Sequence, residues 1–313
     1  MVSLKEYNGR YCESEYEYAF IGFLEAEGWI YSSGNNISRV TKRDVLIADD
    51  FKKFIADTNP DLMEDEVTQI FDNVRLVGSE SDFATLHKVY SWMVDGVQFT
   101  PQYGLVKMIP LIDFENWDKN IFRVVNQFTV EYTNNGQKQN RRPDVLLFVN
   151  GMPLCIIELK NPADAHATVY DAWEQINIRY WRDIPHLLHY CPLACISDGV
   201  KTRLGTVRTS YEHFYAWRRV NDGDKVSTLP FAETETMIKG VYAPERFLEI
   251  FRDYIYFQDS IYDSSEVEIV CRYPQFFAAR LLKQSIVNSV ATKSGKGGTY
   301  FGATGCGKTY TMA

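Results

Sequence analysis

The sequence predicts an α/β chain of the α+β kind, with a mixed central sheet flanked by helices. Three observations indicate this class. Residues 141–180 follow a strand–turn–strand–helix pattern, with the turn at Asn150-Gly151, where both residues tolerate positive φ. Residues 13–27 have the apolar spacing of an amphipathic helix. Residues 122–132 alternate apolar and polar side chains, as a half-buried strand does.

Composition restricts the classes of protein to which the chain can belong. With 313 residues, of which 45% are hydrophobic, it can bury one large core or two ordinary ones. The formal net charge of −8 argues against a surface that binds nucleic acid over its whole extent. Residues 138–219, however, carry eleven Lys and Arg against eight Asp and Glu, a local charge of +3. This suits a confined phosphate-binding surface, and equally a solvated face of mixed charge.

Cysteine usage and the first residues indicate the compartment. The six cysteines are scattered and stand mostly in apolar runs, so they indicate reduced thiols of a cytosolic protein rather than a disulfide framework. They are Cys12, Cys155, Cys191, Cys195, Cys271 and Cys306. The start, MVSLKEYNGRYCESEYEY, is polar and charged and predicts no signal peptide. Because no apolar run approaches the length of a membrane span, we expect no contact with a membrane.

The first expected element is the helix over residues 13–27. Phe20, Ile21 and Leu24 form its buried stripe, and Glu17 lies at helical spacing from all three. This spacing places the Glu17 carboxylate on the side of the helix that packs against the sheet.

Residues of about 36–100 carry further helical patterns but no recognisable chemistry. Residues 43–57 and 82–94 predict helices, with the acid-rich PDLMEDE between them. We expect an inserted helical layer that packs beside the sheet. A strand is predicted next, over residues 106–114.

The hairpin within residues 141–180 concentrates charge at one end. Asp144 opens its first strand, and Glu158-Leu159-Lys160 closes its second. Because strand side chains alternate, Glu158 and Lys160 project to one side while Leu159 turns into the core. Two carboxylates and an ammonium are costly to desolvate unless they hold something. A hard divalent cation beside a phosphate is the candidate.

This convergence depends on the register of the hairpin. With a simple two-residue turn, Asp144 would face Ile157, and Glu158 would point to the opposite side of the sheet. One extra residue, in a longer loop or a bulge, brings Asp144 and Glu158 together. Pro153 cannot donate to the strand ladder and is a plausible place for the irregularity. We predict this odd offset.

These residues resemble a known family. Pro143-Asp144 followed by Glu158-x-Lys160 matches the PD-(D/E)xK nuclease signature, and DVLLFVNGMPLCIIELKNP is similar to the nuclease domain of the restriction (R) subunit of type I restriction–modification enzymes. The resemblance implies a restriction-endonuclease-like fold and a Mg²⁺-dependent DNA endonuclease. It also implies double-stranded DNA and the methyltransferase (M) and specificity (S) subunits as partners, in the cytoplasm of a prokaryote.

The resemblance also implies roles for single residues. Asp144 and Glu158, with the Leu159 carbonyl, would hold Mg²⁺, and Lys160 would orient the attacking water or offset charge in the transition state. Each residue alone also has an ordinary structural interpretation, Asp144 as a solvated acid at the end of a strand and Lys160 as an edge lysine.

Two helices are expected to add further groups to this site. In the family the first helix often supplies a carboxylate, for which Glu17 is the first choice and Glu13 the second, although an exposed helix acid explains Glu17 equally well. The helix after the hairpin carries Gln175 and Tyr180, which the family usually places four apart. Here they are five apart, so only one reaches the site unless the helix bulges. Gln175 is favoured, and core packing is the other interpretation of Tyr180.

Two further sets of residues are candidates for binding. The candidates for contact with DNA phosphates, which alternatively remain solvated, are Arg141, Arg142, Arg179 and Arg218. The second set lies in HLLHYCPLAC, whose His and Cys spacing allows a zinc site in principle. Residues 187–196 are apolar and predict a buried strand, however, which would scatter these ligands between its two faces.

The last part of the chain changes character. Residues 240–257 predict a helix that closes the nuclease domain in the family, and the acidic stretch 258–268 is the candidate boundary. We therefore expect an endonuclease domain over residues 1–260 and the start of an ATP-dependent motor over 261–313. An amphipathic helix, a glycine-rich linker and a short strand over 299–301 are predicted there.

That strand precedes GATGCGKT, a complete P-loop pattern. It resembles the start of a RecA-like superfamily 2 helicase motor, which implies ATP with Mg²⁺ as a ligand of the longer protein. The residues implied in nucleotide binding are Gly302, Gly305, Gly307, Lys308 and Thr309, together with Arg272 and Gln275 where adenine is recognised. Because the sequence stops before an acidic magnesium-holding strand, we expect no ATP turnover by this chain.

Two other functions are compatible with these motifs. The first is a related module that docks DNA or assembles a complex without cutting. The second is an ATP-binding module in which the hairpin is merely structural.

Overall fold

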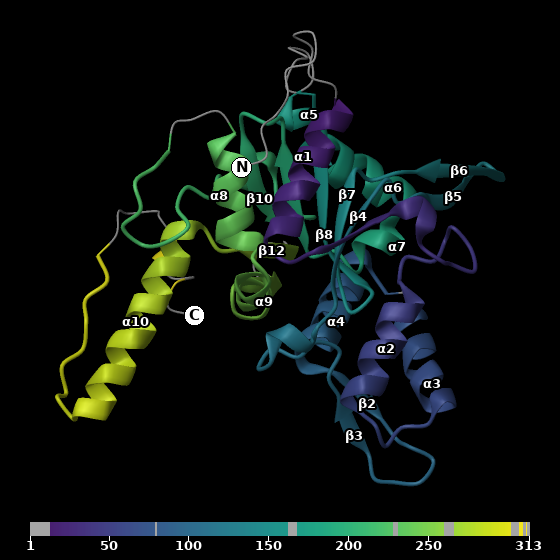
Figure 1. Cartoon of the computed structure of the whole chain (residues 1–313), viewed down its shortest axis with the longest axis horizontal. Helices are drawn as coiled ribbons and strands as arrows, with labels where there is room; N and C mark the ends of the chain where they lie inside the picture. The colour runs from purple at the N-terminus through teal and green to yellow at the C-terminus, as the bar shows by residue number, and fades with distance from the viewer. Residues whose placement is uncertain are drawn as a thin grey trace.

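A six-stranded mixed sheet forms the centre of the molecule, in the order β1-β4-β7-β8-β9-β10 (Figure 1). The computed structural model describes residues 13–78, 80–161, 168–227, 231–259, 266–301, 307, 308 and 311. The strands are β1 (Ile30–Ser33), β4 (Phe122–Asn126), β7 (Val145–Val149), β8 (Met152–Leu159), β9 (Leu193–Ser197) and β10 (Thr202–Thr206). β1 pairs with β4 and β8 with β9 in parallel, and the other neighbours are antiparallel. The predicted mixed sheet is confirmed.

Helices cover both faces of the sheet. Side chains of β8 alternate between the faces, and Cys155 contacts Tyr242 whereas Glu158 contacts Tyr180. The Cys155 face is covered by α1 (Glu13–Ala26), α8 (Ala232–Met237), the π-helix η5 (Ile238–Tyr242) and α9 (Pro244–Asp253). The Glu158 face is covered by α5 (Val169–Glu174) and the π-helix η3 (Gln175–Tyr180). The short helices α6 (Trp181–Asp183) and α7 (Pro185–Leu188) then lead to β9.

The register of the β7–β8 hairpin contains the predicted odd offset. Asn150 and Gly151 turn the chain with φ values of 49° and 76°. Phe148 pairs with Pro153, but Leu147 pairs with Cys155, so one extra residue, Leu154, is inserted in β8. The ladder then continues to the pair Val145–Ile157, which places Asp144 directly opposite Glu158. The bulge lies next to the proline at which it was expected.

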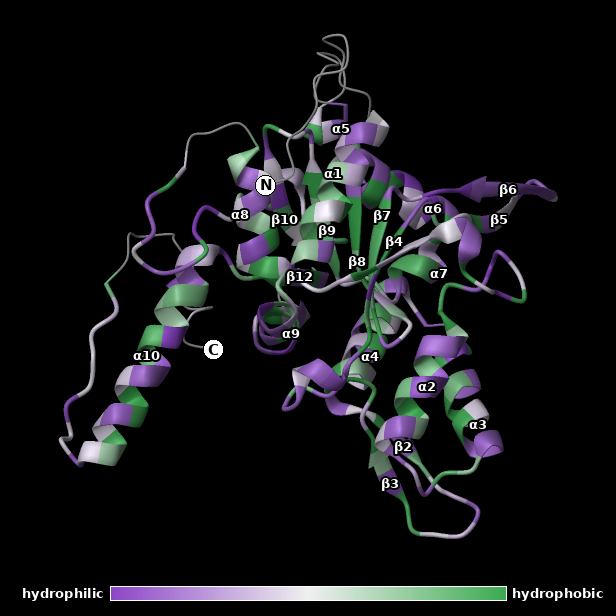
Figure 2. Ribbon diagram, viewed as in Figure 1, coloured by the Kyte–Doolittle hydropathy of each residue, from purple (hydrophilic) through white to green (hydrophobic). Residues whose placement is uncertain are grey.

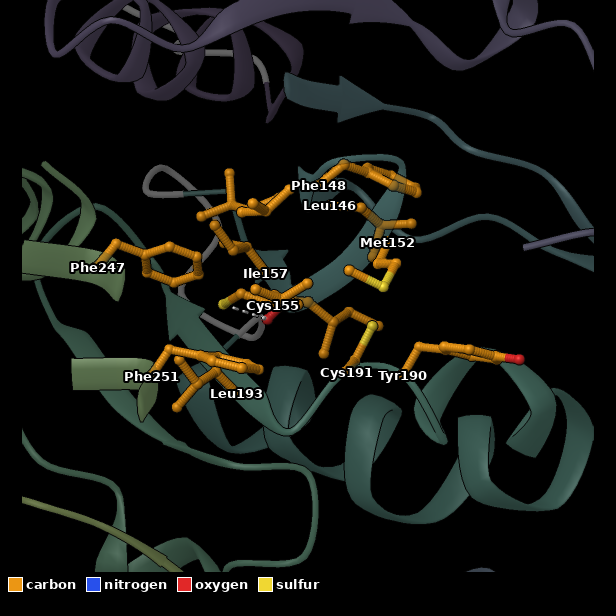
Figure 3. Packing of buried hydrophobic residues seen from close by; sticks show 14 of the residues in the cluster. Leu146, Phe148, Met152, Cys155, Ile157, Tyr190, Cys191, Leu193, Phe247 and Phe251 are labelled. Atoms are coloured by element: carbon orange, nitrogen blue, oxygen red, sulfur yellow. Dashed lines mark hydrogen bonds between the residues drawn. The ribbon is translucent and has the colours of Figure 1, made fainter. Parts of the chain in front are cut away.

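The core is built on this hairpin, in which every residue of β7 and β8 is buried. Figure 3 shows part of it, with Phe247 and Phe251 of α9 beside Cys155 and Leu193. The predicted stripe of α1 is buried as well, since Phe20, Ile21 and Leu24 are at most 1% exposed. Burying side chains of this size contributes about 1.5–3 kcal/mol each, so the hairpin is stabilised by the core on both faces of the sheet.

The helical insertion extends from the turn end of the hairpin rather than over a face of the sheet (Figure 1). It contains α2 (Ala48–Thr58), α3 (Glu64–Arg75), α4 (Asp82–Asp95) and the two-stranded sheet of β2 (Val97–Phe99) and β3 (Lys107–Ile109). The N–H of Ile47 donates to the Gly151 carbonyl and joins the insertion to the turn. The acid-rich stretch starts α3, where the Glu66 carboxylate accepts the Met63 N–H. The strand predicted over 106–114 is reduced to β3.

Three other predicted elements differ in the structure. The strand predicted over 122–132 is divided at Gln127, whose φ is 54°; the chain then enters the hairpin of β5 (Val130–Asn134) and β6 (Gln137–Arg141). The strand predicted over 187–196 begins only at β9, because α7 and a turn precede it. The helix predicted over 240–257 ends at Asp253.

The acidic stretch after α9 is partly a hairpin. β11 (Ile255–Asp259) pairs with β12 (Glu266–Val270), so the described residues of the expected boundary are ordered strands. The helix α10 (Tyr273–Thr292) follows, and residues 299–301 form no strand, because a lone strand finds no partner there. Short 3₁₀ helices lie at Gly34–Asn36, Trp117–Lys119 and Tyr211–His213. In the described part of the chain, no helix combines the length and the apolar character needed to cross a membrane.

Candidate active site

Asp144 and Glu158 meet at the end of the hairpin opposite the turn. The Asp144 Oδ2 atom accepts the backbone N–H of Leu159 at 2.8 Å, and the Asp144 N–H donates to Glu158 Oε1 at 3.4 Å. Both carboxylates therefore lie on the same face of the sheet, as the odd offset requires. The pairing depends on the bulge at Leu154, since Ile157 would stand opposite Asp144 if Leu154 were paired in a regular ladder.

The two carboxylates share a buried environment that disfavours their negative charge. Burial raises the pKa of Glu158 well above its ordinary value, and the neighbouring Asp144 raises it further. Burial also raises the pKa of Asp144. Glu158 has no exposed surface at all. A cation bound between them would offset the charge that burial leaves uncompensated.

Lys160 and Gln175 complete a chain of hydrogen bonds with Glu158. The Lys160 ammonium donates to Gln175 Oε1 at 2.9 Å, and the Gln175 amide donates to Glu158 Oε2 at 2.6 Å. The amide can satisfy both because it carries an acceptor and a donor. The structure thus brings together four of the five residues predicted to be catalytic, Asp144, Glu158, Lys160 and Gln175.

A π-helix brings Tyr180 to the same carboxylate. Residues Gln175–Tyr180 form η3, in which backbone hydrogen bonds span five residues rather than four, so residues five apart share a face. The Tyr180 hydroxyl donates to Glu158 Oε1 at 2.8 Å and accepts from the Gln175 amide at 2.8 Å. The bulge that the five-residue spacing requires is therefore present. Tyr180 packs in the core as expected, and its hydroxyl also reaches the site.

Glu17 lies beside this cluster rather than in it. Its carboxylate accepts from the side chains of Asn126, at 2.6 Å, and Gln127, at 2.7 Å. The backbone N–H of Gln127 donates in turn to the Asp144 carbonyl. Among the described residues, no three His, Cys, Asp or Glu side chains are grouped to hold a metal ion. The structure therefore connects Glu17 to Asp144 through Gln127; the Glu13 side chain lies outside the described residues.

A cationic pocket of about 560 Å³ opens next to Gln175 and Tyr180. Its other lining residues are Lys42, Thr129, Asn140, Arg141, Arg142 and Arg179, and no carboxylate is among the described residues that line it. Arg141 is anchored by Asp183, and Arg179 pairs with Glu174 at 3.2 Å. Sequence patterns gave no signal for Lys42, which comes from a loop distant in the chain. Arg218, the fourth predicted DNA contact, is exposed and lines other pockets.

The described His and Cys residues of HLLHYCPLAC form no metal centre. Cys191 and Cys195 are buried free thiols, and burial raises the pKa of both. His189 contacts Asp82, and burial lowers the pKa of His186 to about 4. These side chains pack in the core or contact neighbours from different elements.

The P-loop prediction falls mostly outside the described residues, which exclude Gly302, Gly305 and Thr309. Gly307 and Lys308 are described, and the Gln275 amide donates to the Gly307 carbonyl at 3.1 Å. Gln275 also caps α10 by accepting the N–H of Arg272. The Arg272 guanidinium stacks on the Tyr215 ring with its carbon 3.5 Å from the centroid. The two ends of the proposed nucleotide site therefore touch.

Comparison with known proteins places this geometry in context. Residues 11–213 match the family described as type I restriction enzyme R protein N terminus. The putative type I restriction enzyme MjaIXP endonuclease subunit of Methanocaldococcus jannaschii is 29% identical over 95% of the chain and 30% of its own length. The type I restriction enzyme HindI endonuclease subunit of Haemophilus influenzae is 28% identical over 96% of the chain and 29% of its own length. The chain thus spans less than a third of these relatives.

Proposed function

The chain belongs to the family of the type I restriction enzyme R protein N terminus, and we propose that it is a Mg²⁺-dependent endonuclease that hydrolyses phosphodiester bonds of DNA. The observation that carries the proposal is the convergence of Asp144, Glu158 and Lys160 from two neighbouring strands. Buried carboxylates with raised pKa values beside an ammonium and a cationic pocket match the needs of a phosphate and its metal.

Asp144 and Glu158, with the Leu159 carbonyl, would hold the Mg²⁺ ion. Their donor atoms are all hard oxygens, which this cation prefers. When bound, the metal polarises the phosphate and lowers the pKa of a water molecule. Lys160 would orient that water or stabilise charge that develops on the phosphate in the transition state.

Gln175 and Tyr180 would position the charged groups. Gln175 would set the distance between the Lys160 ammonium and the Glu158 carboxylate, because its amide is hydrogen-bonded to both groups. Tyr180 fixes the orientation of the Glu158 carboxylate. Residues that hydrogen-bond to metal ligands typically orient these ligands and also change the affinity for the metal. For Glu17 we propose a positioning role. Its carboxylate accepts a hydrogen bond from the Gln127 side chain, and the Gln127 backbone N–H donates to the Asp144 carbonyl.

In the longer protein, cutting would be coupled to ATP-driven translocation along double-stranded DNA. The contact between Gln275 and Gly307 supports a nucleotide site that starts in this chain. The methyltransferase and specificity subunits would complete the complex and read the recognition sequence.

Lys160→Ala tests the proposal directly. We expect nicking of plasmid DNA with Mg²⁺ to be abolished while the circular dichroism spectrum stays that of the parent chain. Lys53→Ala is the matched control, since Lys53 pairs with Asp57 on the exposed surface of α2. Nicking by the Lys160→Ala variant at an unchanged rate would overturn the assignment.

Calorimetry with Mn²⁺ separates the nuclease from its rivals. The nuclease should bind Mn²⁺ and lose it in Asp144→Ala, because one of the two buried carboxylates is removed. A docking module would bind duplex DNA without cutting it. An ATP-binding module would bind nucleotide with no metal-dependent nicking in any variant.

A further inference from the structure

The hairpin of β5 and β6, here called the ribbon, projects from the body of the molecule beside the candidate active site (Figure 1). Its strands turn at Asn135-Gly136, with φ values of 48° and 75°, the same kind of turn that closes the β7–β8 hairpin. Residues 133–140 are all exposed. Val130 is buried and Tyr132 packs against the core at the base of the ribbon, whereas the exposed part beyond them leaves both faces and both edges open.

The exposed part of the ribbon, residues 133–140, carries no large apolar side chain that could cover a core. Residues 133–140 read TNNGQKQN, so amide side chains predominate and β6 is hydrophilic throughout (Figure 2). A hairpin that served to cover a core would carry an apolar face. Amides are the side chains that form paired hydrogen bonds with base edges, and the charge of Lys138 is paired with Glu131 at 3.0 Å.

The ribbon is held firmly to the site. Arg141, at the end of β6, donates to the Asp183 carboxylate at 2.7 Å, and its guanidinium lies 5.6 Å above the Tyr132 ring. The chain continues through Arg142 and Pro143 into Asp144. A ligand that binds the ribbon is therefore placed at a defined distance from the carboxylate pair.

The cationic pocket continues the ribbon toward that pair. Asn140 and Arg141 line the pocket, together with Lys42, Arg142 and Arg179. Arg141 and Arg179 are paired with Asp183 and Glu174. Lys42 and Arg142 add two further cations to a described lining that holds no carboxylate, in contrast with the net charge of −8 of the whole chain. This complementarity favours a polyanion over a protein surface of mixed charge.

We propose that the ribbon enters the groove of double-stranded DNA and seats the backbone of one strand across the cationic pocket. The major groove admits a two-stranded ribbon, and the amides on its exposed strands would face base edges while the pocket takes the phosphates. The inference rests on the proposed function only for the hydrolysis of the phosphodiester bond that the pocket holds, and not for the binding of the duplex.

Shortening the ribbon tests the proposal. Deletion of Thr133, Asn134, Gln137 and Lys138 removes two residues from each strand, which preserves the alternation of faces and the Asn-Gly turn. The Arg141–Asp183 anchor remains. Affinity for a short DNA duplex and for its single strand is measured by fluorescence anisotropy in Ca²⁺. A second variant, Gln137→Ala with Gln139→Ala, changes only exposed side chains and serves if the deletion disturbs folding.

Gln98→Ala with Gln102→Ala is the matched control, because these amides are exposed on and beside the β2–β3 sheet, far along the chain from the pocket. We expect the ribbon variants to lose duplex affinity by roughly fivefold or more per amide contact, with a smaller effect on single-stranded DNA. The shortened ribbon should also lower the slope of the salt dependence by at most about one, because Lys138, which is paired with Glu131, is removed. Mn²⁺ binding should remain.

Several results would overturn the inference. One is that both ribbon variants bind duplex DNA with the affinity of the parent chain. Another is that the parent chain itself binds no duplex DNA. A third is that the ribbon is needed only for binding another protein subunit. The proposed function fails separately: nicking by Lys160→Ala would remove the nuclease and leave a ribbon-dependent duplex affinity standing. If nicking still depended on Lys160 but shortening the ribbon left the duplex affinity unchanged, the ribbon inference would fail and the proposed nuclease would stand.

Discussion

Replacing Tyr180 by Phe removes one oxygen atom from the buried hydrogen-bond chain of the site. The hydroxyl donates to Glu158 Oε1 and accepts from Gln175, and Tyr180 is 2% exposed. After the substitution, the contact of Oε1 with the Asp144 N–H at 3.4 Å is the remaining one that the structure defines. A buried acceptor without its donor costs about 1–3 kcal/mol of unfolding free energy.

The substitution should also weaken metal binding. The hydrogen bond from Tyr180 lowers the pKa of Glu158, so its loss strengthens the hold of this carboxyl on its proton. Because a metal competes with that proton, we expect the affinity for Mn²⁺ to fall by roughly tenfold to a hundredfold, as for other outer partners of metal ligands. Calorimetric titration measures the affinity, and urea denaturation of the metal-free chain measures the stability.

Tyr190→Phe provides the matched control. Tyr190 is 3% exposed and its hydroxyl donates to the Val74 carbonyl at 2.6 Å, away from the carboxylate pair. This variant should lose a similar amount of stability and keep the affinity of the parent for Mn²⁺. If Tyr180→Phe and Tyr190→Phe lowered stability alike and neither changed Mn²⁺ binding, the reasoning about the orientation of Glu158 would be refuted.

Three further outcomes are expected. Deleting Ile178 should turn the π-helix into an α-helix and preserve Mn²⁺ binding, whereas inserting an alanine after it should abolish binding in the same titration. Gly151→Ala should unfold at a lower urea concentration than Gly136→Ala. Both residues have positive φ values, which cost an alanine about 1–3 kcal/mol. Of the two, only the Cβ added at Gly151 would meet a backbone atom, the Ile47 carbonyl oxygen at 2.2 Å. His186 is partly buried, and burial lowers its pKa to about 4. As the pH falls from 6.5 to about 4, the unfolded chain binds a proton that folded His186 excludes, so the unfolding free energy should drop by up to roughly 1.4 kcal/mol per pH unit. His186→Gln should remove this part of the pH dependence in urea titrations at several pH values.

The hairpin was predictable from the sequence because its determinants are local. The alternation of side chains and the cost of burying charge favour Asp144 opposite Glu158, and with a two-residue Asn-Gly turn this pairing requires one extra residue. The identity of the extra residue was not accessible in the same way. Leu154 rather than Pro153 is inserted, and that choice depends on how the side chains of β7 and α9 fill the core around it.

Elements that depend on distant partners were predicted less well. Residues 255–259 look like the end of a helix, but they pair with 266–270 and become a strand. Gln127 follows β4 in a left-handed conformation. This conformation is supported by two hydrogen bonds, from its side chain to the Glu17 carboxylate and from its backbone N–H to the Asp144 carbonyl. Such contacts join segments that are far apart in the chain, and periodicity within one segment carries no information about them.

The inserted residue of β8 has a consequence for how this chain can change in evolution. Between the turn and Glu158, the number of residues decides whether the acid points toward Asp144 or into the α9 side of the core. Loss of a single residue could be absorbed by loss of the bulge, which would leave Glu158 opposite Asp144 in a regular ladder. Gain of a single residue would require a second bulge or would turn the acid to the other face. Shortening of this strand by one residue should therefore be tolerated more readily than lengthening it by one.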